Sequence, residues 1–224
     1  MAEGTLDPAV TTADRAAEAL REGIVTGALE PGTPLREVTL AGELGVSRNT
    51  LREALRQLTI EGLVTQRIHK GAMVSTMSAE RIRDTYRVRR TLELRAVEES
   101  GTATAAALNA VDAAVRATEE AARAGKWGEV GTASLRFHCT IVALLGSPML
   151  DGMFRGVVAQ QRLAFAVVAN EQDIQEPWVA RDRELCDFLH AGYRAAAGRA
   201  LREYLDDSER AVLGVVGPES SADL

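Results

Sequence analysis

The sequence predicts a mostly α protein with two parts. The N-terminal part is a set of short helices closed by a small β-hairpin, and the C-terminal part is an antiparallel α-helical bundle. Hydrophobic residues make up 46% of the 224 positions and aromatic residues only 4%. Alanine and leucine, which are strong helix formers, dominate. Strand-like segments end near residue 76, and long helical patterns separated by glycine and proline follow.

Four segments make up the predicted domain organisation. Each of the two central segments is long enough to bury its own core. The segments are a flexible arm (1–10), an N-terminal domain (11–76), a six-helix domain (77–213) and a flexible tail (214–224). The N-terminal domain is predicted to begin with a helix over residues 13–26 and a loop over residues 27–34.

Two short helices joined by a tight turn are predicted next, over residues 37–44 and 48–61. Ser47 is the expected N-cap of the second helix, because its hydroxyl can accept a hydrogen bond from a free N–H group of the first turn. The second helix has two faces at helical spacing. One face carries Leu51, Leu55 and Leu58, and the other carries Arg48, Arg52 and Arg56.

The arginine face suits a helix that reads the major groove of DNA, where the first turn points at base edges. Three arginines alone fit an ordinary solvated helix equally well. The following residues favour DNA binding, because two strands over 63–67 and 72–76 are joined by a turn with a cation and a glycine. The expected DNA contacts are Arg36, Ser47, Arg48, Asn49, Thr50, Arg52, Arg56, His69, Lys70 and Gly71, with Arg21 near the DNA backbone.

A family resemblance is carried by LRE, by LAGELGVSRNTLREALRQLTIEGLV and by the KG of the hairpin. Residues 15–76 resemble the winged helix-turn-helix DNA-binding domain of GntR-family bacterial transcription regulators. Two departures from the family pattern occur. Val38 stands where many members carry an arginine that touches DNA, and Asn49-Thr50 replaces the commoner Thr-Pro, so the operator sequence is expected to differ.

Charge and hydropathy limit the location and the partners. The net charge is −6, but residues 11–76 carry eight basic and eight acidic side chains. Nonspecific DNA affinity should therefore be weak and salt-sensitive.

No apolar run approaches the roughly 18 residues of a membrane span, and no signal peptide is evident, so we expect a cytoplasmic protein with no membrane partner. Cys139 and Cys186 are expected to be small core residues.

Six helices are predicted after Ser78, with breaks at glycine and proline. They cover residues 79–100, 104–124, 127–145, 148–170, 177–191 and 193–213. YRVRRTLELRA, LRFHCTIVALLGSPML and the HAG turn resemble the ligand-sensing FCD domain of the FadR subfamily of GntR regulators, in its VanR-like six-helix form. The resemblance implies a homodimer with an effector site inside the bundle.

Many members of that subfamily hold a divalent metal with one aspartate and three histidines. The resemblance places Ser134, His138, Asp182 and Tyr204 at those four positions, so only His138 retains the family's residue. One imidazole and one carboxylate are a poor donor set for Zn²⁺ or Ni²⁺. We therefore expect no tightly bound metal, with a divalent metal as the alternative.

The four degenerate positions and a stripe on residues 79–100 define the expected effector site. Helical spacing places Arg89 and Glu93 on the inner face with Ile82 and Tyr86. Either Arg89 forms a structural pair with Glu93 at i, i+4, or it binds the carboxylate of a small organic acid. The expected effector-binding residues are Arg89, Glu93, Ser134, His138, Asp182 and Tyr204.

The expected function is a homodimeric transcription regulator, a repressor, that binds a palindromic double-stranded operator and responds to a small carboxylate effector. Two alternatives remain. A winged helix can serve protein contacts without an effector. An enzyme using the bundle cavity is the weaker alternative, since Ser134 and His138 lack an orienting third group in sequence and no cofactor fingerprint occurs.

Overall fold

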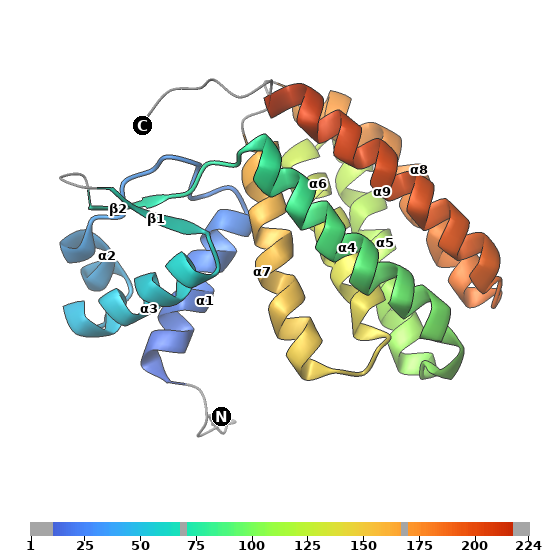
Figure 1. Ribbon diagram of the computed structural model, residues 1–224, viewed down its shortest axis with the longest axis horizontal. Helices are drawn as coiled ribbons and strands as arrows, with labels where there is room; N and C mark the ends of the chain where they lie inside the picture. Colours follow the sequence, from blue (N-terminus) through green and yellow to red (C-terminus); the bar gives the residue numbers. More distant parts are fainter. Residues whose placement is uncertain (1–10, 68–70, 167–169, 217–224) are drawn as a thin grey trace. The chain divides into compact units, whose positions relative to one another are not determined.

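The computed structural model describes residues 11–67, 71–166 and 170–216, shown in Figure 1. The chain divides into unit 1, Met1–Ser75, and unit 2, Thr76–Leu224. Both units are built mainly from helices, and the described strands form one two-stranded antiparallel sheet in unit 1. The predicted mostly α fold class, with a small hairpin and a helical bundle, is confirmed.

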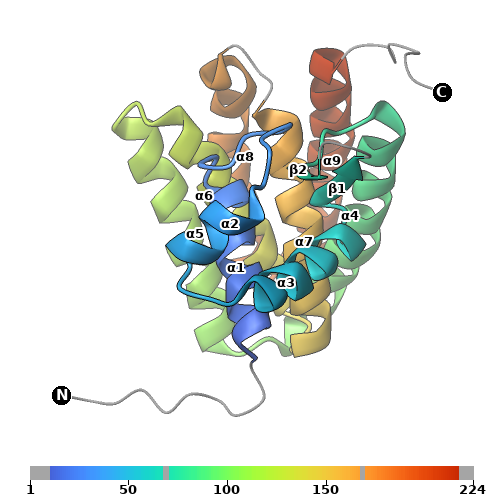
Figure 2. The same cartoon turned by 90° about the vertical axis from the view of Figure 1, so that its left-hand side faces the viewer.

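Unit 1 contains three helices and a hairpin within its described residues, and Figure 2 turns this unit toward the viewer. Its elements are α1 (Thr12–Val25), α2 (Glu37–Glu43), α3 (Arg48–Ile60), β1 (Val64–Arg67) and β2 (Gly71–Val74). A capping box between Thr11 and Asp14 starts α1, and the Ser47 hydroxyl accepts a hydrogen bond from the Thr50 N–H at 3.1 Å, as predicted. Leu51, Leu55 and Leu58 are at most 2% exposed, so the leucine face of α3 forms the core.

The hairpin receives additional backbone pairing from the segment before α2, which the sequence predicts to be a loop. Val64 pairs with Val74 across β1 and β2. On the other edge of β2, the Leu35 N–H donates to the Ala72 carbonyl at 2.8 Å and the Val74 N–H donates to the Thr33 carbonyl at 2.9 Å. These bonds fix the start of α2 against the hairpin, because they satisfy backbone groups that a free loop would leave to water.

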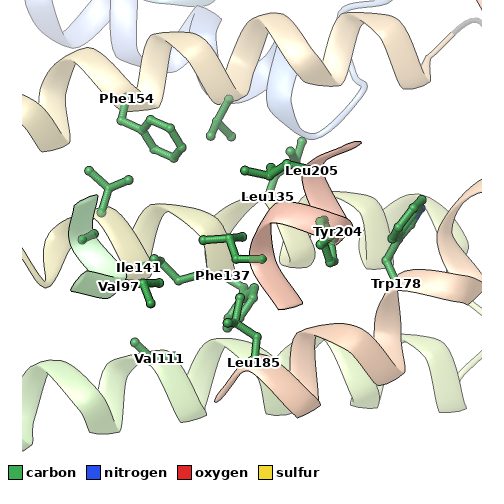
Figure 3. Close-up of a cluster of buried hydrophobic side chains, with 14 of the residues drawn as sticks. Val97, Val111, Leu135, Phe137, Ile141, Phe154, Trp178, Leu185, Tyr204 and Leu205 are labelled. Atoms are coloured by element: carbon green, nitrogen blue, oxygen red, sulfur yellow. The ribbon is translucent and has the colours of Figure 1, made fainter. Parts of the chain in front are cut away.

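Unit 2 is a bundle in which α6 is the central helix. Its elements are α4 (Ala79–Glu99), a short 3-10 turn η1 (Ser100–Thr102), α5 (Ala105–Arg123), α6 (Trp127–Ala143), α7 (Pro148–Phe165), α8 (Glu171–His190) and α9 (Arg194–Val216). Helix α6 packs against α4, α5, α7 and α8, while α4 also packs along α9. Figure 3 shows the resulting apolar core, where Leu135, Phe137 and Ile141 of α6 meet side chains from the other helices.

Three predicted boundaries in unit 2 are wrong. Helix α7 ends at Phe165 rather than at 170, and α8 begins at Glu171 rather than at Pro177. The Asn170 side chain accepts a hydrogen bond from the Gln172 N–H at 3.1 Å and thus caps α8 early. Pro177 lies inside α8, so a proline need not mark the start of a helix. Helix α9 continues to Val216, past the predicted start of the tail at 214.

Replacing Pro177 with Ala should stabilise the protein. Proline has no N–H, so the carbonyl of Asp173 loses its partner one turn earlier in α8, and the ring crowds that carbonyl. Because Pro177 is exposed, the substitution creates no cavity. The free energy of unfolding in urea should rise by about 1 to 3 kcal/mol. Glu176→Ala, at the neighbouring exposed position, is the control and should change it by less than about 0.5 kcal/mol.

Candidate DNA-binding surface and buried polar site

Helix α3 exposes the arginine face that the sequence predicts. The side chains of Arg48 and Arg52 are 60% and 48% exposed, and Asn49 and Arg56 are also exposed. The opposite face is buried in unit 1. The buried face therefore fixes α3 in unit 1, while the opposite face exposes a row of arginines, as in a helix that enters a major groove.

Glu37 of α2 organises two of these arginines. Its Oε2 accepts a hydrogen bond from Arg52 Nε at 2.9 Å and lies 4.0 Å from Arg48 Nη2. Because Nε of Arg52 is held, its Nη groups remain oriented for a bidentate contact with a guanine or a phosphate. The role of Glu37 was not predicted, because 15 residues separate it from Arg52 and no helical spacing connects them.

The remaining predicted DNA contacts of unit 1 have different environments. Arg36 is exposed before α2, and Gly71 has a φ of 76°, which favours glycine at the hairpin turn. His69 and Lys70 lie outside the described residues. Arg21, which is expected near the DNA backbone, has a side chain that is 14% exposed and binds the Glu61 carboxylate through Nε at 2.9 Å and Nη2 at 2.6 Å. Arg21 thus joins α1 to the end of α3.

In unit 2, Arg89 and Glu93 of α4 both face inward, at 1% and 0% exposure. Arg89 Nε donates to Glu93 Oε1 at 2.7 Å, and Nη1 donates to Gln161 Oε1 of α7 at 3.1 Å. The predicted i, i+4 pair is present and buried in the bundle, and binding of a carboxylate by Arg89 stays a prediction. Arg89 Nη2 is buried without a hydrogen-bond partner, so one donor remains for a ligand.

His138 of α6 lies between two carboxylates. Its Nδ1 is 2.6 Å from Glu93 Oε2, and its Nε2 is 3.9 Å from Asp182 Oδ1 of α8. An ionised carboxylate only accepts hydrogen bonds, so Nδ1 carries the hydrogen and Nε2 of the neutral ring is an acceptor. Nε2 is buried without a hydrogen-bond partner, and the buried Asp182 carboxylate has the Ser134 and Tyr204 hydroxyl groups as neighbouring donors. The predicted convergence of α6 and α8 polar groups is present.

Ser134 and Tyr204 complete this set, which we call the central polar site: Arg89, Glu93, Ser134, His138, Asp182 and Tyr204. The Ser134 and Tyr204 hydroxyl oxygens are 3.4 Å apart. The rings of His138 and Tyr204 meet edge to face at 4.9 Å, and Figure 3 shows Tyr204 beside Trp178. The aromatic edges limit access of water, so polar groups here interact at low dielectric.

Three further residues support the central polar site, and two of them, Gln161 and Ser208, were not predicted. Gln161 Nε2 donates to the Tyr86 hydroxyl oxygen at 2.5 Å, and that hydroxyl lies 2.5 Å from Ser208 Oγ. The Tyr86 oxygen accepts from Gln161, and either hydroxyl group can be the donor in the bond between Tyr86 and Ser208. This chain of bonds orients the Gln161 carbonyl toward Arg89. Tyr86 was placed on the inner stripe, but its partners come from α7 and α9, which no local spacing connects to α4.

Burial and the fixed charges act differently on the titratable groups. Burial opposes ionisation of Glu93, but the Arg89 and His138 contacts outweigh it and hold the pKa of Glu93 below its usual value. Burial lowers the pKa of His138, so its ring is neutral near pH 7. Burial raises the pKa of Asp182 to about 7. The central polar site therefore holds one balanced ion pair and one carboxyl group that is only partly ionised.

The residues present do not fit a resident transition metal. Glu93 already bonds His138 Nδ1, which leaves one imidazole nitrogen, the Asp182 carboxylate, a phenol and an aliphatic hydroxyl as donors. Zn²⁺ and Ni²⁺ favour several nitrogen or sulfur ligands. Within the described part of the chain, no group of three or more His, Cys, Asp and Glu side chains is arranged to hold a metal ion.

Replacing Glu37 with Gln should reduce the specificity of DNA binding. The substitution replaces the carboxylate that holds Arg52 Nε by a neutral amide, whose oxygen accepts a weaker hydrogen bond. It also removes a negative charge beside the arginine face, so nonspecific affinity should rise. The ratio of operator affinity to nonspecific affinity should fall by about tenfold, measured by fluorescence anisotropy at one salt concentration. Glu43→Gln, on the same helix, is the matched charge control. An unchanged ratio in Glu37→Gln would show that Glu37 does not position Arg52.

Asp182→Asn should stabilise the ligand-free protein at pH 8 more than at pH 5. The pKa of Asp182 in the folded state, about 7, lies above its ordinary value of 3.8, so the native state holds the proton more tightly and Asp182 costs stability as the pH rises from 3.8 towards 7. Asn removes this cost, which amounts to at most about 4 kcal/mol at pH 8. Urea unfolding at the two pH values measures it, and equal effects at both would contradict the raised pKa of the buried carboxyl group.

Comparison with known proteins follows the same division of the chain. The model for bacterial regulatory proteins of the gntR family matches residues 12–74, and the FCD domain model matches residues 84–207. A solved structure from Rhodococcus sp. RHA1, described as a transcriptional regulator GntR, is 34% identical, with a TM-score of 0.83, over 90% of this chain and 97% of that chain. Escherichia coli McbR/YncC, at 20% identity and a TM-score of 0.78 over 91% of this chain and 97% of that chain, shares the fold.

A relative from Paenarthrobacter nicotinovorans, named "Probable D-xylose utilization operon transcriptional repressor", is 26% identical over 81% of this chain and 80% of its own length. The Nta operon transcriptional regulator of Aminobacter aminovorans is 45% identical over 30% of this chain and 32% of its own length. These relatives are transcription regulators rather than enzymes. Among the described helices, none is long and apolar enough to cross a membrane. The chain belongs to the GntR family of bacterial transcription regulators, in the FadR subfamily whose members combine a winged helix-turn-helix with an FCD domain.

Proposed function

We propose that the protein is a repressor that binds a palindromic operator as a homodimer and is released by a small organic acid. The observation that carries the proposal is the combination of an exposed arginine face on α3 with buried, unpaired polar atoms inside the FCD domain. The first supplies DNA contacts, and the second calls for a ligand, since each unpaired buried polar group costs about 1 to 3 kcal/mol.

DNA recognition would use Arg48, Asn49, Thr50, Arg52 and Arg56, which lie on or beside the exposed face of α3. Ser47, Arg36 and the hairpin residues His69, Lys70 and Gly71 would contact the backbone or the adjacent groove. Two copies related by a two-fold axis present two α3 helices, so the operator should contain two half-sites in inverted repeat. Relatives named as operon repressors support the sign of regulation.

The chemistry of the central polar site supports an acid that also carries a hydroxyl group. Arg89 Nη2 offers a donor to a carboxylate, whereas His138 Nε2 is an acceptor without a donor and lies beside Asp182, whose neighbouring donors are the Ser134 and Tyr204 hydroxyl groups. A carboxylate alone would satisfy Arg89 and repel ionised Asp182. A hydroxy acid satisfies both sides, with Glu93 fixing Arg89 and His138, and with Ser134 and Tyr204 as neighbouring hydroxyl groups.

Such an effector can release DNA only if it binds the arrangement that does not bind DNA more tightly than the arrangement that does. Coupling of about 1 to 3 kcal/mol, typical of allosteric proteins, corresponds to a 5- to 150-fold loss of operator affinity. This coupling distinguishes the proposal from a winged helix that serves protein contacts alone, which would need neither an operator nor an effector.

Replacing Arg52 with Ala tests DNA recognition. The operator is first selected from random duplex DNA with the purified full-length protein. If Arg52 touches a base, the variant should lose about 1 to 3 kcal/mol of operator affinity and relax specificity at one base pair of each half-site. Arg95→Ala, whose side chain is 61% exposed on α4, is the control for loss of one positive charge. Equal affinities of wild type and Arg52→Ala would refute the assigned role.

The effector is tested by adding small hydroxy acids and their deoxy analogues to the complex with labelled operator. At least one hydroxy acid should release the protein from the labelled operator, seen as a saturable fall in fluorescence anisotropy. Its deoxy analogue should need an about tenfold higher concentration for half-maximal release, because it lacks the hydroxyl group that donates to His138 or Asp182. Asp182→Asn should reduce this difference between the two ligands. Release that is equally sensitive to both would contradict the role given to His138 and Asp182.

A further inference from the structure

A second set of buried, unpaired polar atoms lies between α6, α7 and α8, and we call it the Arg162 cluster. It consists of Arg162 of α7 with Glu171 and Gln175 of α8. Arg162 and Gln175 are 3% and 2% exposed. Arg162 Nη2 donates to Glu171 Oε1 at 3.0 Å. Four other atoms are buried without hydrogen-bond partners: Arg162 Nε, Arg162 Nη1, Gln175 Nε2 and Glu171 Oε2.

The cluster packs against a glycine face of α6. A Cβ atom at Gly131 would lie 2.9 Å from Gln175 Nε2, and one at Gly128 would lie 3.3 Å from Glu171 Oε2. Glu171 and Gln175 are one turn apart on the same face of α8, so both face α6. The two glycines therefore allow these polar side chains to lie inside the bundle, where an apolar pair would pack without unpaired groups.

The Arg162 cluster is separate from the central polar site. Helices α6 and α8 run in the same direction, because residues that come later in α8 lie beside residues that come later in α6. The neighbouring pairs are Glu171 with Gly128, Gln175 with Gly131 and Asp182 with His138. Gln175 precedes Asp182 by seven residues, which at 1.5 Å per residue separates the two sites by roughly 10 Å along α8. Each site also draws its guanidinium group from a different helix.

The unpaired atoms define the ligand by charge and by hydrogen-bonding type. Three of them bear N–H donors that suit a carboxylate, and the fourth is a carboxylate oxygen that suits an ammonium group. The Arg162 charge is already balanced by Glu171, so a simple carboxylate or a simple amine would add an uncompensated charge to the interior. A zwitterion adds no net charge. The Glu171 side chain is 24% exposed, which leaves an approach from solvent on its side.

We propose that the Arg162 cluster is a second ligand site, which binds the main-chain part of a free α-amino acid. The carboxylate lies against Arg162 Nη1 and the Gln175 amide, and the ammonium group lies against Glu171 Oε2. The proposal goes beyond the operator and the central effector, and it depends on neither.

The test measures the thermal unfolding temperature of the full-length protein with each common L-α-amino acid at millimolar concentration. At least one should raise it, and calorimetry should give one molecule per chain. The carboxylic acid that lacks the amino group and the amine that lacks the carboxylate should each bind at least about tenfold more weakly. Gln175→Met, which keeps the chain length, and Glu171→Gln, at a partly exposed position, should each weaken binding by a similar factor.

Gln172→Met is the matched control, because this amide lies on the same helix and bonds only the exposed Glu176, at 3.4 Å. It should leave amino-acid binding unchanged. The proposal is overturned if no amino acid raises the unfolding temperature, if binding persists in both cluster variants, or if either half of the ligand binds as tightly as the whole. The readout does not involve the operator, so these outcomes leave the regulator function unaffected.

Discussion

The buried ion pair between Arg89 and Glu93 constrains the interior of the FCD domain. Neither side chain reaches solvent, and each contacts further helices through its remaining atoms. A buried charge that loses its partner costs about 3 to 5 kcal/mol, so the surrounding polar groups are held in place by this pair. Gln161, His138 and Tyr86 are oriented by it directly or through one intermediate bond. The atoms left unpaired around the pair then define what a ligand must supply.

In the DNA-binding half, an acidic side chain also orients an arginine, but at the surface. Glu37 pairs with Arg52, but both groups are partly exposed, so the pair contributes little stability and mainly orients the guanidinium group. In both halves an acidic side chain fixes an arginine and leaves some of its N–H groups free for a partner. The free N–H groups face DNA in the proposed complex of α3 and a hydroxy acid in the proposed complex of the FCD domain.

Local periodicity predicted much of this arrangement. The leucine and arginine faces of α3, the Ser47 cap and the inward stripe of α4 follow from spacing within one helix, and the family resemblance indicated DNA binding. Glu37, Gln161 and the Arg162 cluster depend on contacts between helices that spacing does not encode. The start of α8 was wrong because capping by Asn170 outweighs the penalty at Pro177. The pairing of Arg21 with Glu61 was not predicted, because Glu61 lies 40 residues away in sequence but adjacent in the fold.

Native mass spectrometry of the full-length protein, with metal analysis of the same sample, tests the central claim most directly. The claim is that the central polar site takes an organic hydroxy acid without a resident metal. The account predicts a dimer with far less than one divalent metal per chain, to which a hydroxy acid adds one molecule per chain in wild type and much less in Asp182→Asn. One Zn²⁺ or Ni²⁺ per chain that survives dialysis and is lost in His138→Ala would contradict it.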